Sequence, residues 1–484
     1  MDSPVMIQPG EPQHPRGAHI TVPADRVPLG IKFGYASGGM AYNLMINSVG
    51  NLAQFVLTLA LGVNPAMVGL ALSIPRFLDA FADPVIGGIS DNFQSRYGRR
   101  KPFMVVGGIG AGLTFALLWM MPHGWSGNAY FWWFLIISII FFLFASLFGI
   151  PWNALGFSLT PDYDERTRLM AFNSFWCSAV LLTIPWLYAA TQMPVFADTL
   201  QGAKWVGIVM GICMIALALV SAFKCHERVV SKTEREKPPT VMHQIRSTLK
   251  NRPFLILSIV VFLMCLGIFS ITSLTPYIAI YHIYGGAEKT ASILLGWGGT
   301  AWQAGSLVFV FIVGAAGVRL GKKLALVLFL ACSVVGCLLK WVCYSPAHPY
   351  LFLIPPLFLA LGFCALWTLT SSMMADVCDL LELETGMRNE ATLGAIYAWI
   401  MKLGTTLAFT LSGFILNATG FDIALGGTQP ERTIFLMRLL DVGLPTVTIA
   451  GAILLTCFYP INEARAQTIR KELEKRRGTL AEGN

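Results

Sequence analysis

Residues 76–84 read Arg76-Phe-Leu-Asp79-Ala-Phe-Ala-Asp83-Pro84, and they lie near the middle of a long apolar segment. Asp79 and Asp83 are one helical turn apart, so both carboxylates project from the same face of a helix, and Arg76 lies on that face too. Each ionised side chain at the centre of a membrane helix costs about 2.5–3.5 kcal/mol on insertion scales. A paired cation, a shared proton or a water-filled cavity would offset this cost.

The composition assigns the chain to the helical membrane proteins. Its 484 residues are 55% hydrophobic and only 12% charged, whereas ordinary soluble domains carry about 25% charged residues. The apolar runs are long rather than alternating, which favours membrane helices. The net charge is +8, but the basic residues cluster between the apolar runs. This pattern is typical of cytoplasmic loops beside a lipid bilayer, so we expect no nucleic-acid partner.

Twelve apolar runs are long enough to cross a bilayer, which takes about 20 residues. They predict an all-α membrane protein with twelve transmembrane helices in two pseudo-symmetric six-helix bundles, the fold of a duplicated transporter. The runs are 31–61, 65–90, 102–122, 129–158, 170–192, 204–224, 254–283, 291–316, 323–344, 349–376, 391–418 and 434–459.

The loop charges divide the chain further and orient it. The basic loops fall on one side of the predicted bundle, so we expect both termini in the cytoplasm and the protein in the plasma membrane, which is the inner membrane in a bacterium. The predicted parts are a cytoplasmic N-terminal segment (1–30), the first bundle (31–224), a cytoplasmic linker (225–253), the second bundle (254–460) and a basic cytoplasmic tail (461–484).

Corresponding loops of the two halves carry related charged motifs. Acidic groups follow the fourth and the tenth span, and basic groups follow the second and the eighth. Asp91 lies in the loop after the second span, where the positive-inside rule predicts basic residues only. Its negative charge favours a role of this loop in gating over a role in membrane orientation alone. The candidate gating residues are Asp91, Arg99, Arg100, Asp162, Asp376, Asp379 and Arg388.

Motifs of enzyme chemistry are missing from the sequence. No histidine lies mid-span, and there is no glycine-rich phosphate loop or evident nucleophile–base pair. The ten cysteines are scattered without metal-ligand spacing. We therefore expect neither an enzyme nor a cofactor, and no metal beyond a possible Na⁺.

A family resemblance rests on three motifs. They are Asp79-Ala-Phe-Ala-Asp83-Pro84, the loop from Gly88-Ile-Ser-Asp91 to Gly98-Arg99-Arg100-Lys101-Pro102, and Met373-Met-Ala-Asp376-Val-Cys-Asp379. They resemble the major facilitator superfamily (MFS), and within it the glycoside–pentoside–hexuronide:cation symporters typified by melibiose permease. The resemblance extends across essentially the whole chain and implies a secondary transporter.

The resemblance also implies roles for single positions. Asp79 and Asp83 match the family's cation-site carboxylates, and Ser146 matches a hydroxyl that joins them. Lys402 matches a lysine near that site, and Trp367 matches an aromatic residue that lines the cavity. Either a monovalent hard cation or a proton shared by the carboxylates fits these oxygens, so Na⁺ and H⁺ both stay open.

Lys402 needs a partner on physical grounds as well. It lies about eleven residues from the nearest end of its span, too far to snorkel easily to a surface. The paired aspartates of the other half are the natural partner, which would couple cation occupancy to closure of the halves; a local hydroxyl or carbonyl is the alternative. Arg76, on the face of the acids, is the second candidate coupling residue.

Four positions depart from the family's pattern. Melibiose-type relatives grip the sugar with acids on the first and fourth spans, where this chain has Gly39 and Gly149. A basic residue of the fifth span is replaced by Ser174, and the asparagine before the second cation-site acid by Ala82. These departures bear on galactoside recognition and on sodium coupling.

Neutral amides and indole rings are the remaining candidates for solute binding. Asn43 and Asn47 begin a polar stripe that continues through Asn51 and Gln54 on one face of the first span, and Asn153 lies on the fourth span. The amides replace the missing carboxylates in one interpretation and join helices in the other. Trp152, Trp367 and Trp399 offer rings for a pyranose, or else pack between helices.

Together these features predict a monomeric, alternating-access symporter. It would couple Na⁺ or H⁺ to the movement of a sugar, a glycoside or a related small polar organic solute. A lysophospholipid carrier on the same fold is the closest alternative, because such carriers resemble the family too. A membrane receptor that transports nothing is the alternative from another class.

Overall fold

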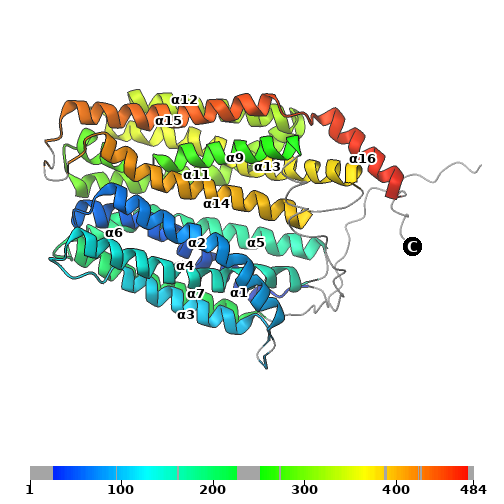
Figure 1. The fold of residues 1–484 in the computed structure, drawn as a ribbon, viewed down its shortest axis with the longest axis horizontal. Helices are drawn as coiled ribbons and strands as arrows, with labels where there is room; N and C mark the ends of the chain where they lie inside the picture. Colours follow the sequence, from blue (N-terminus) through cyan, green and yellow to red (C-terminus); the bar gives the residue numbers. More distant parts are fainter. Residues whose placement is uncertain are drawn as a thin grey trace, which may run out of the picture.

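The computed structural model describes residues 26–93, 95–96, 98–160, 163–225, 251–271, 274–385, 390–422, 425 and 428–477, and these residues form helices and no strand. The first half of the chain makes one bundle (Figure 1). Its elements are α1 (Leu29–Ala53), continued by the π-helix η2 (Gln54–Ala60), α2 (Pro65–Asn92), α3 (Lys101–Leu118), α4 (Gly127–Ser158), α5 (Tyr163–Leu181) with η3 (Ile184–Trp186) and α6 (Leu187–Thr191), and α7 (Thr199–Lys224).

The second half makes the other bundle, which lies alongside the first (Figure 1). Its elements are α9 (Arg252–Ser270), α10 (Leu274–Tyr277) with the π-helix η4 (Ile278–Ile283), α11 (Glu288–Arg319), α12 (Lys322–Cys343), η5 (Pro349–Leu353) with α13 (Ile354–Thr385), α14 (Glu390–Ala418), α15 (Glu431–Cys457) and α16 (Glu463–Arg477). Most of the predicted linker, residues 226–250, lies outside the described residues.

Eleven helices of the described chain are long and apolar enough to cross a membrane. The predicted first span, which corresponds to α1 and η2, is not among them. Its four amides (Asn43, Asn47, Asn51 and Gln54) make it more polar than the others. It still lies inside the first bundle against α4, α5 and α7, so the predicted arrangement of two six-helix halves is confirmed.

Polar side chains define where several of these helices begin. Asn64 accepts a hydrogen bond from the backbone N–H of Ala66 at the start of α2, and Asn251 does the same for Phe254 at the start of α9. Asp198 caps α7 through the N–H of Gln201. Each cap satisfies a donor that has no partner within its helix.

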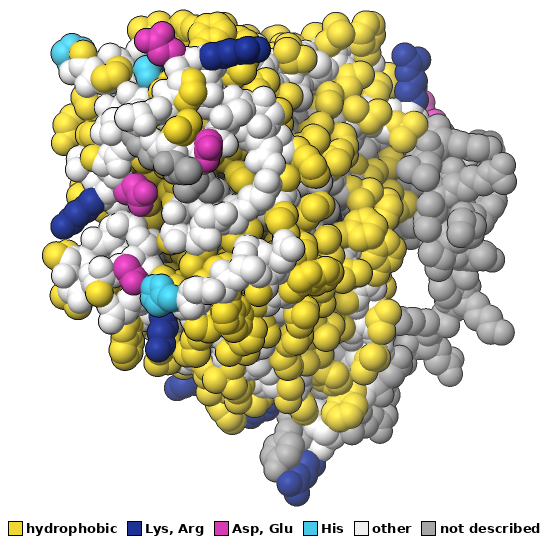
Figure 2. All heavy atoms as spheres, turned by 60° about the vertical axis from the view of Figure 1, so that its left-hand side comes forward, with side chains coloured by type: hydrophobic (Ala, Val, Ile, Leu, Met, Phe, Trp, Pro, Cys, Tyr) yellow, Lys and Arg dark blue, Asp and Glu magenta, His cyan; other side chains and the backbone are white. Residues whose placement is uncertain are grey.

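The flank of the molecule is hydrophobic, and Figure 2 shows charged side chains mainly at its ends and margins. Large apolar side chains such as Leu113, Trp132, Ile136 and Phe311 are more than half exposed. Soluble monomers rarely expose contiguous apolar patches beyond a few hundred Å². This surface therefore fits a lipid environment.

The two halves pack directly at the end of the bundle opposite the Arg99–Lys101 loop, which we call the distal end. A side chain at Gly413 of α14 would lie 2.1 Å from the carbonyl oxygen of Pro65 in α2, so only glycine permits this approach. Nearby, the amide of Asn417 donates to Asn64 at 2.7 Å.

Further contacts between the halves join the end of the fifth span to the N-terminal part of α11, from its first residue, Glu288, to Thr300. The indole N–H of Trp186 donates to Thr300 at 2.9 Å, and Tyr188 donates to Glu288 at 3.2 Å. Tyr188 and Phe55 of the first half also belong to a buried apolar cluster built mostly from the second half. The distal end is thus closed by glycine packing, by apolar contacts and by hydrogen bonds, one of which ends on the carboxylate of Glu288.

Candidate functional site

A cavity of about 510 Å³ lies between the two halves, within the size range of small-molecule sites. The elements α1, η2, α2, α4, η3 and α6 line it from the first half, and α9, α10, α11, α13 and α14 line it from the second. The lining residues are Tyr42, Asn43, Ile46, Asn47, Gly50, Asn51, Gln54, Phe55, Arg76, Asp79, Phe142, Ile184, Pro185, Tyr188, Phe269, Pro276, Leu295, Gly299, Trp367, Met401, Lys402, Thr405 and Phe409.

An ionic cluster forms one wall of this cavity. The ammonium of Lys402 in α14 donates to Asp79 Oδ2 at 2.9 Å and to Asp83 Oδ2 in a shorter contact. The hydroxyl of Ser146 in α4 donates to Asp79 Oδ1. Asp79 is buried, whereas Asp83 and Lys402 are each about one-third exposed. The structure therefore brings together the four residues that the sequence assigned to the cation site and its coupling lysine.

The carboxylates sit on a helix whose backbone is interrupted on both sides of them. Pro75 and Pro84 both lie inside α2, and each removes one backbone N–H from the helical hydrogen-bond ladder. Asp79 and Asp83 occupy the two turns between these prolines, where their one-turn spacing directs both toward Lys402.

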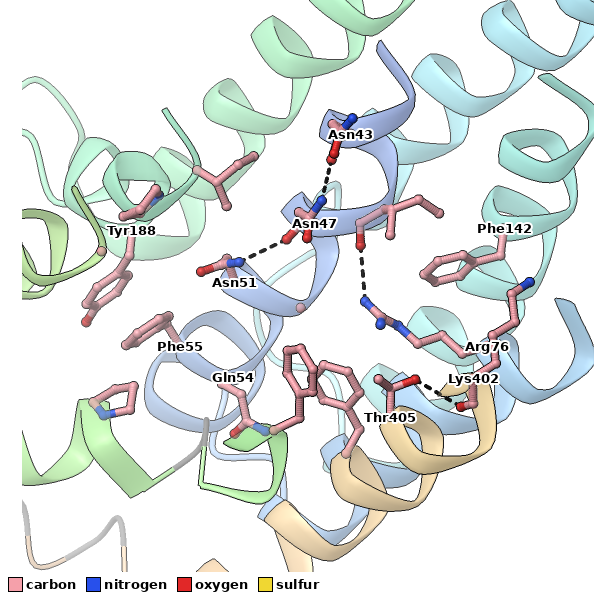
Figure 3. Close-up of a pocket in the computed structure, with 18 of the residues that line it drawn as sticks. Asn43, Asn47, Asn51, Gln54, Phe55, Arg76, Phe142, Tyr188, Lys402 and Thr405 are labelled. Carbon is pink, nitrogen blue, oxygen red and sulfur yellow. Dashed lines mark hydrogen bonds between the residues drawn. The ribbon is translucent and has the colours of Figure 1, made fainter. Parts of the chain in front are cut away.

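Arg76 lies in the same cavity but takes no part in the ionic cluster. Its Nη2 donates to the carbonyl oxygen of Ile46 at 3.1 Å. Its guanidinium lies 4.5 Å from the ring centre of Phe409 and 5.7 Å from that of Phe142. Figure 3 shows it reaching across from α2 to α1. Aromatic rings and a backbone oxygen thus surround the cation that the sequence placed beside the acids.

The polar stripe of α1 faces the cavity (Figure 3). Asn43, Asn47 and Asn51 each donate from Nδ2 to the backbone oxygen one turn earlier, at 2.9, 2.9 and 3.0 Å. Since a backbone oxygen only accepts, the side-chain oxygen of each amide remains an acceptor. Gln54 is buried at the cavity wall, and neither polar atom of its amide has a hydrogen-bond partner among the described residues.

The three tryptophans have different surroundings. Trp367 lines the cavity. Trp152 does not: its indole N–H donates to the Tyr35 carbonyl at 3.0 Å and its ring stacks on Tyr35 at 5.1 Å, which packs α4 against α1. Trp399 is 41% exposed and lies edge-on to Phe81 outside the cavity lining.

Asn153 also departs from the expectation that it binds solute. It is exposed and does not line the cavity, because it follows buried Trp152 directly and adjacent residues of a helix point in different directions. The solute-binding hypothesis therefore retains Asn43, Asn47 and Trp367 as cavity residues, and loses its structural support at Trp152, Trp399 and Asn153.

Two of the candidate gating residues, Arg100 and Asp376, make contacts within their own halves. Arg100 donates to the Ala154 carbonyl at 2.9 Å in the first half, and Lys322 pairs with Asp376 at 2.7 Å in the second. Asp379 lines a second cavity beside α16, and Arg99 lies just before α3. Asp162, Arg388 and the side chain of Asp91 lie outside the described residues.

Several cavity residues escaped the sequence analysis. Thr405 lies one turn after Lys402, and its hydroxyl donates to the Lys402 carbonyl at 2.9 Å. Phe409 follows two turns after Lys402, and Phe142 lies one turn before Ser146. Helical spacing from an assigned polar residue was a signal that could have found all three.

A second buried ion pair lies in the second half, away from the cavity. Lys340 of α12 and Asp441 of α15 are both almost fully buried and 3.0 Å apart, and Asp441 also accepts from Thr275 at 2.6 Å. Its position joins three elements of one half, which fits a role in holding that half together. Among the described residues, no group of three His, Cys, Asp or Glu side chains could hold a metal ion.

Comparisons with known proteins agree with this architecture. A family model for MFS/sugar transport proteins matches residues 34–463. An uncharacterised symporter of Synechocystis sp. is 25% identical over 94% of this chain and 98% of its own length. A putative glycoside/cation symporter of Escherichia coli is 23% identical over 93% and 96%. A solved structure of a D-xylose–proton symporter shares the fold, with a TM-score of 0.59 at 14% identity over 89% of this chain and 98% of that one.

Proposed function

The chain belongs to the MFS/sugar transport protein family, and we propose that it carries a sugar, a glycoside or a related polar solute together with Na⁺ or H⁺ by alternating access. Its relatives are transporters, so the protein is a carrier and not an enzyme. The glycoside/cation symporter among them supports the cargo class. The lysophospholipid alternative receives no comparable support.

One observation carries the proposal: a lysine of one half is bonded to two carboxylates of the other beside the cavity. Lys402 brings one positive charge to two negative ones. The cluster therefore retains a net negative charge, which one monovalent cation would neutralise. Two intramembrane carboxylates that share one ammonium are a natural place for a coupling ion.

The oxygen ligands define how the coupling ion would bind. Asp79, Asp83 and the Ser146 hydroxyl present hard oxygen atoms to Na⁺. For H⁺, one of the two carboxylates would take the proton, because two close carboxylates resist joint ionisation. In either case the ion competes with the ammonium of Lys402 for the same oxygens.

This competition supplies the link between ion binding and movement. With Lys402 bonded to α2, the two halves are tied together beside the cavity. An ion on Asp79 and Asp83 weakens this tie, so the ion changes the relative stability of the conformations in which the halves meet differently. The free-energy difference between the two conformations can change by no more than the difference in the ion's binding free energy for them.

The direct test is uptake of a panel of labelled glycosides into proteoliposomes, with sodium and proton gradients imposed separately. We expect at least one solute of the panel to accumulate above its outside concentration under one of the two gradients. Downhill equilibration without accumulation under either gradient would refute coupling. No flux of any solute would favour a receptor instead.

A further inference from the structure

The buried ion pair of the second half belongs neither to the cavity nor to the ionic cluster. The ammonium of Lys340 in α12 lies 3.0 Å from Asp441 Oδ2 in α15, and the two side chains are 3% and 0% exposed. Taking two charges out of water costs free energy that their attraction does not reliably return, so such a pair is weak evidence for stability alone. We therefore expect this pair to serve a second purpose.

The corresponding crossing in the first half is made by glycines. The third and sixth spans of that half are α3 and α7, as α12 and α15 are those of the second half. A side chain at Gly211 of α7 would lie 2.4 Å from the carbonyl oxygen of Gly112 in α3, so these helices meet backbone to backbone. The second half carries a carboxylate at this crossing instead, which points to a task that glycine packing cannot perform.

The carboxylate of Asp441 also binds the seventh span. Helix α9 ends at Ser270, and α10 begins at Leu274. The hydroxyl of Thr275 in α10 donates to Asp441 Oδ1 at 2.6 Å, while the ammonium of Lys340 donates to Oδ2. Each carboxylate oxygen thus has a partner from a different helix, and the ammonium orients the acceptor that holds Thr275.

The residues directly after Thr275 reach the cavity and the first half of the molecule. Pro276 lines the cavity. Tyr277 is fully buried in the apolar cluster to which the first half contributes Phe55 and Tyr188. The hydrogen bond from Thr275 therefore lies at the start of the surface that meets the first half at the distal end.

The far end of this element is attached to the second half as well. The π-helix η4 continues α10, and the ring Nε2 of His282 in η4 lies 3.1 Å from the carbonyl oxygen of Tyr344, which follows α12. Phe421, after α14, packs edge-on against Tyr277 with the ring centres 4.8 Å apart. The distal part of the seventh span is therefore held by its own half at both ends.

We propose that Asp441 is a positioning residue for transport, which holds α10 and η4 in the place from which they close the distal end. Lys340 is the counter-ion that orients this buried carboxylate. A surface that is already fixed loses little conformational freedom when it meets its partner, so this attachment favours closure. The inference rests on the proposed transport cycle, but distal closure itself can be measured without a solute.

The first test measures distal closure in the purified full-length protein. Thr58 of η2 is fully buried and lies beside Tyr277 of the second half. Thr58→Cys therefore reports distal opening through its rate of labelling by a charged maleimide, read at that position by mass spectrometry. We expect Thr275→Val to raise this rate about three- to tenfold, because it removes a hydrogen bond to a charged acceptor.

Thr446→Val is the matched control for this change. Thr446 of α15 is half-buried like Thr275, but its hydroxyl donates to the Val442 carbonyl of its own helix. Its loss should leave the labelling rate within about twofold of that of the reporter alone. An unchanged rate in Thr275→Val would overturn the assignment, and so would an equal rise in both valine variants.

The second test separates the hydrogen bond from the charges. Lys340→Met with Asp441→Asn removes both charges but keeps an acceptor for Thr275, whereas Lys340→Met with Asp441→Leu removes the acceptor too. Neither combination leaves one buried charge alone, which would destabilise the fold. We expect the first combination to label like the reporter alone and the second to label like Thr275→Val. Equal rates in the two would show that closure does not depend on this bond.

The third test uses transport of whichever solute of the glycoside panel accumulates. Thr275→Val leaves Asp79, Asp83 and Lys402 in place, so we expect a lower maximal uptake rate with an unchanged half-saturating concentration of the coupling ion. A raised half-saturating ion concentration with an unchanged maximal rate would contradict a role in distal closure. If no solute accumulates, the symport proposal fails, while the labelling rates still decide whether Asp441 positions the seventh span.

Discussion

The two halves of the molecule meet in two chemically different ways. At the distal end Gly413 lies against the backbone of α2 and Asn417 donates to Asn64, and both of these contacts are neutral. Beside the cavity the contact is ionic and runs from Lys402 to Asp79 and Asp83. A cation has no direct means to compete at the crossing of Gly413 and α2, but it can compete for Asp79 and Asp83. The ionic contact is therefore the one that a coupling ion can control.

The largest effect is expected where the ionic contact is removed. Lys402→Met leaves Asp79 and Asp83 without their ammonium, so two carboxylates, one of them buried, lose the cation that compensates them. The carboxylates should then retain a cation or proton throughout the cycle, so accumulation should fall to the outside concentration while exchange of solute continues. Proteoliposome uptake and counterflow measure the two quantities.

Lys204→Met is the control for this change. Lys204 is an exposed lysine of α7, far in the chain from the ionic cluster, and its loss should alter neither quantity. Unchanged accumulation in Lys402→Met would show that ion coupling does not pass through the contact between the halves.

A smaller effect is expected from opening the neutral contact. Gly413→Val puts a side chain onto the Pro65 carbonyl and forces α2 and α14 apart at the distal end. A shift of about 1.4 kcal/mol against distal closure lowers the transport rate roughly tenfold without changing ion affinity. The uptake rate and its dependence on ion concentration separate the two.

Gly394→Val tests whether valine lowers the rate simply by destabilising α14, wherever in the helix it is introduced. Gly394 lies on the same helix with open space around its Cβ position, so this variant should retain most of the rate. A rate loss of similar size in both variants would contradict a closing role for the glycine crossing.

The smallest effect is expected from trimming one ligand of the ionic cluster. Ser146→Ala removes the hydroxyl that donates to Asp79, and a hydrogen bond to a charged group contributes about 1.5–3 kcal/mol. We expect the concentration of coupling ion at half-maximal uptake to rise at least about tenfold, with the maximal rate retained. Asn153→Ala, on the same helix but outside the cavity, should change neither.

The sequence was sufficient for the fold and for the ionic cluster. Long apolar runs and loop charges predicted two six-helix halves, because membrane thickness sets helix length. The position of Lys402 predicted its partners, since a mid-span lysine that cannot reach either surface needs an acid. Both inferences rest on the cost of charge in lipid, which a sequence displays directly.

The sequence could not predict which way single side chains turn. Periodicity defines the faces of one helix, but the rotation of that helix against its neighbours depends on packing between distant residues. Trp152 illustrates this limit, because its indole N–H donates to the Tyr35 carbonyl and its ring does not line the cavity. Arg76 illustrates it too, because its neighbours Phe142 and Phe409 come from other helices.

The central claim is that Asp79 and Asp83 bind the coupling ion, and ion-driven accumulation in proteoliposomes tests it most directly. Asp79→Asn and Asp83→Asn should each abolish accumulation under the driving gradient. Asp198→Asn, which preserves a helix cap in a distal loop, should accumulate solute like the unaltered protein. Undiminished gradient-driven accumulation in either cavity variant would contradict the account.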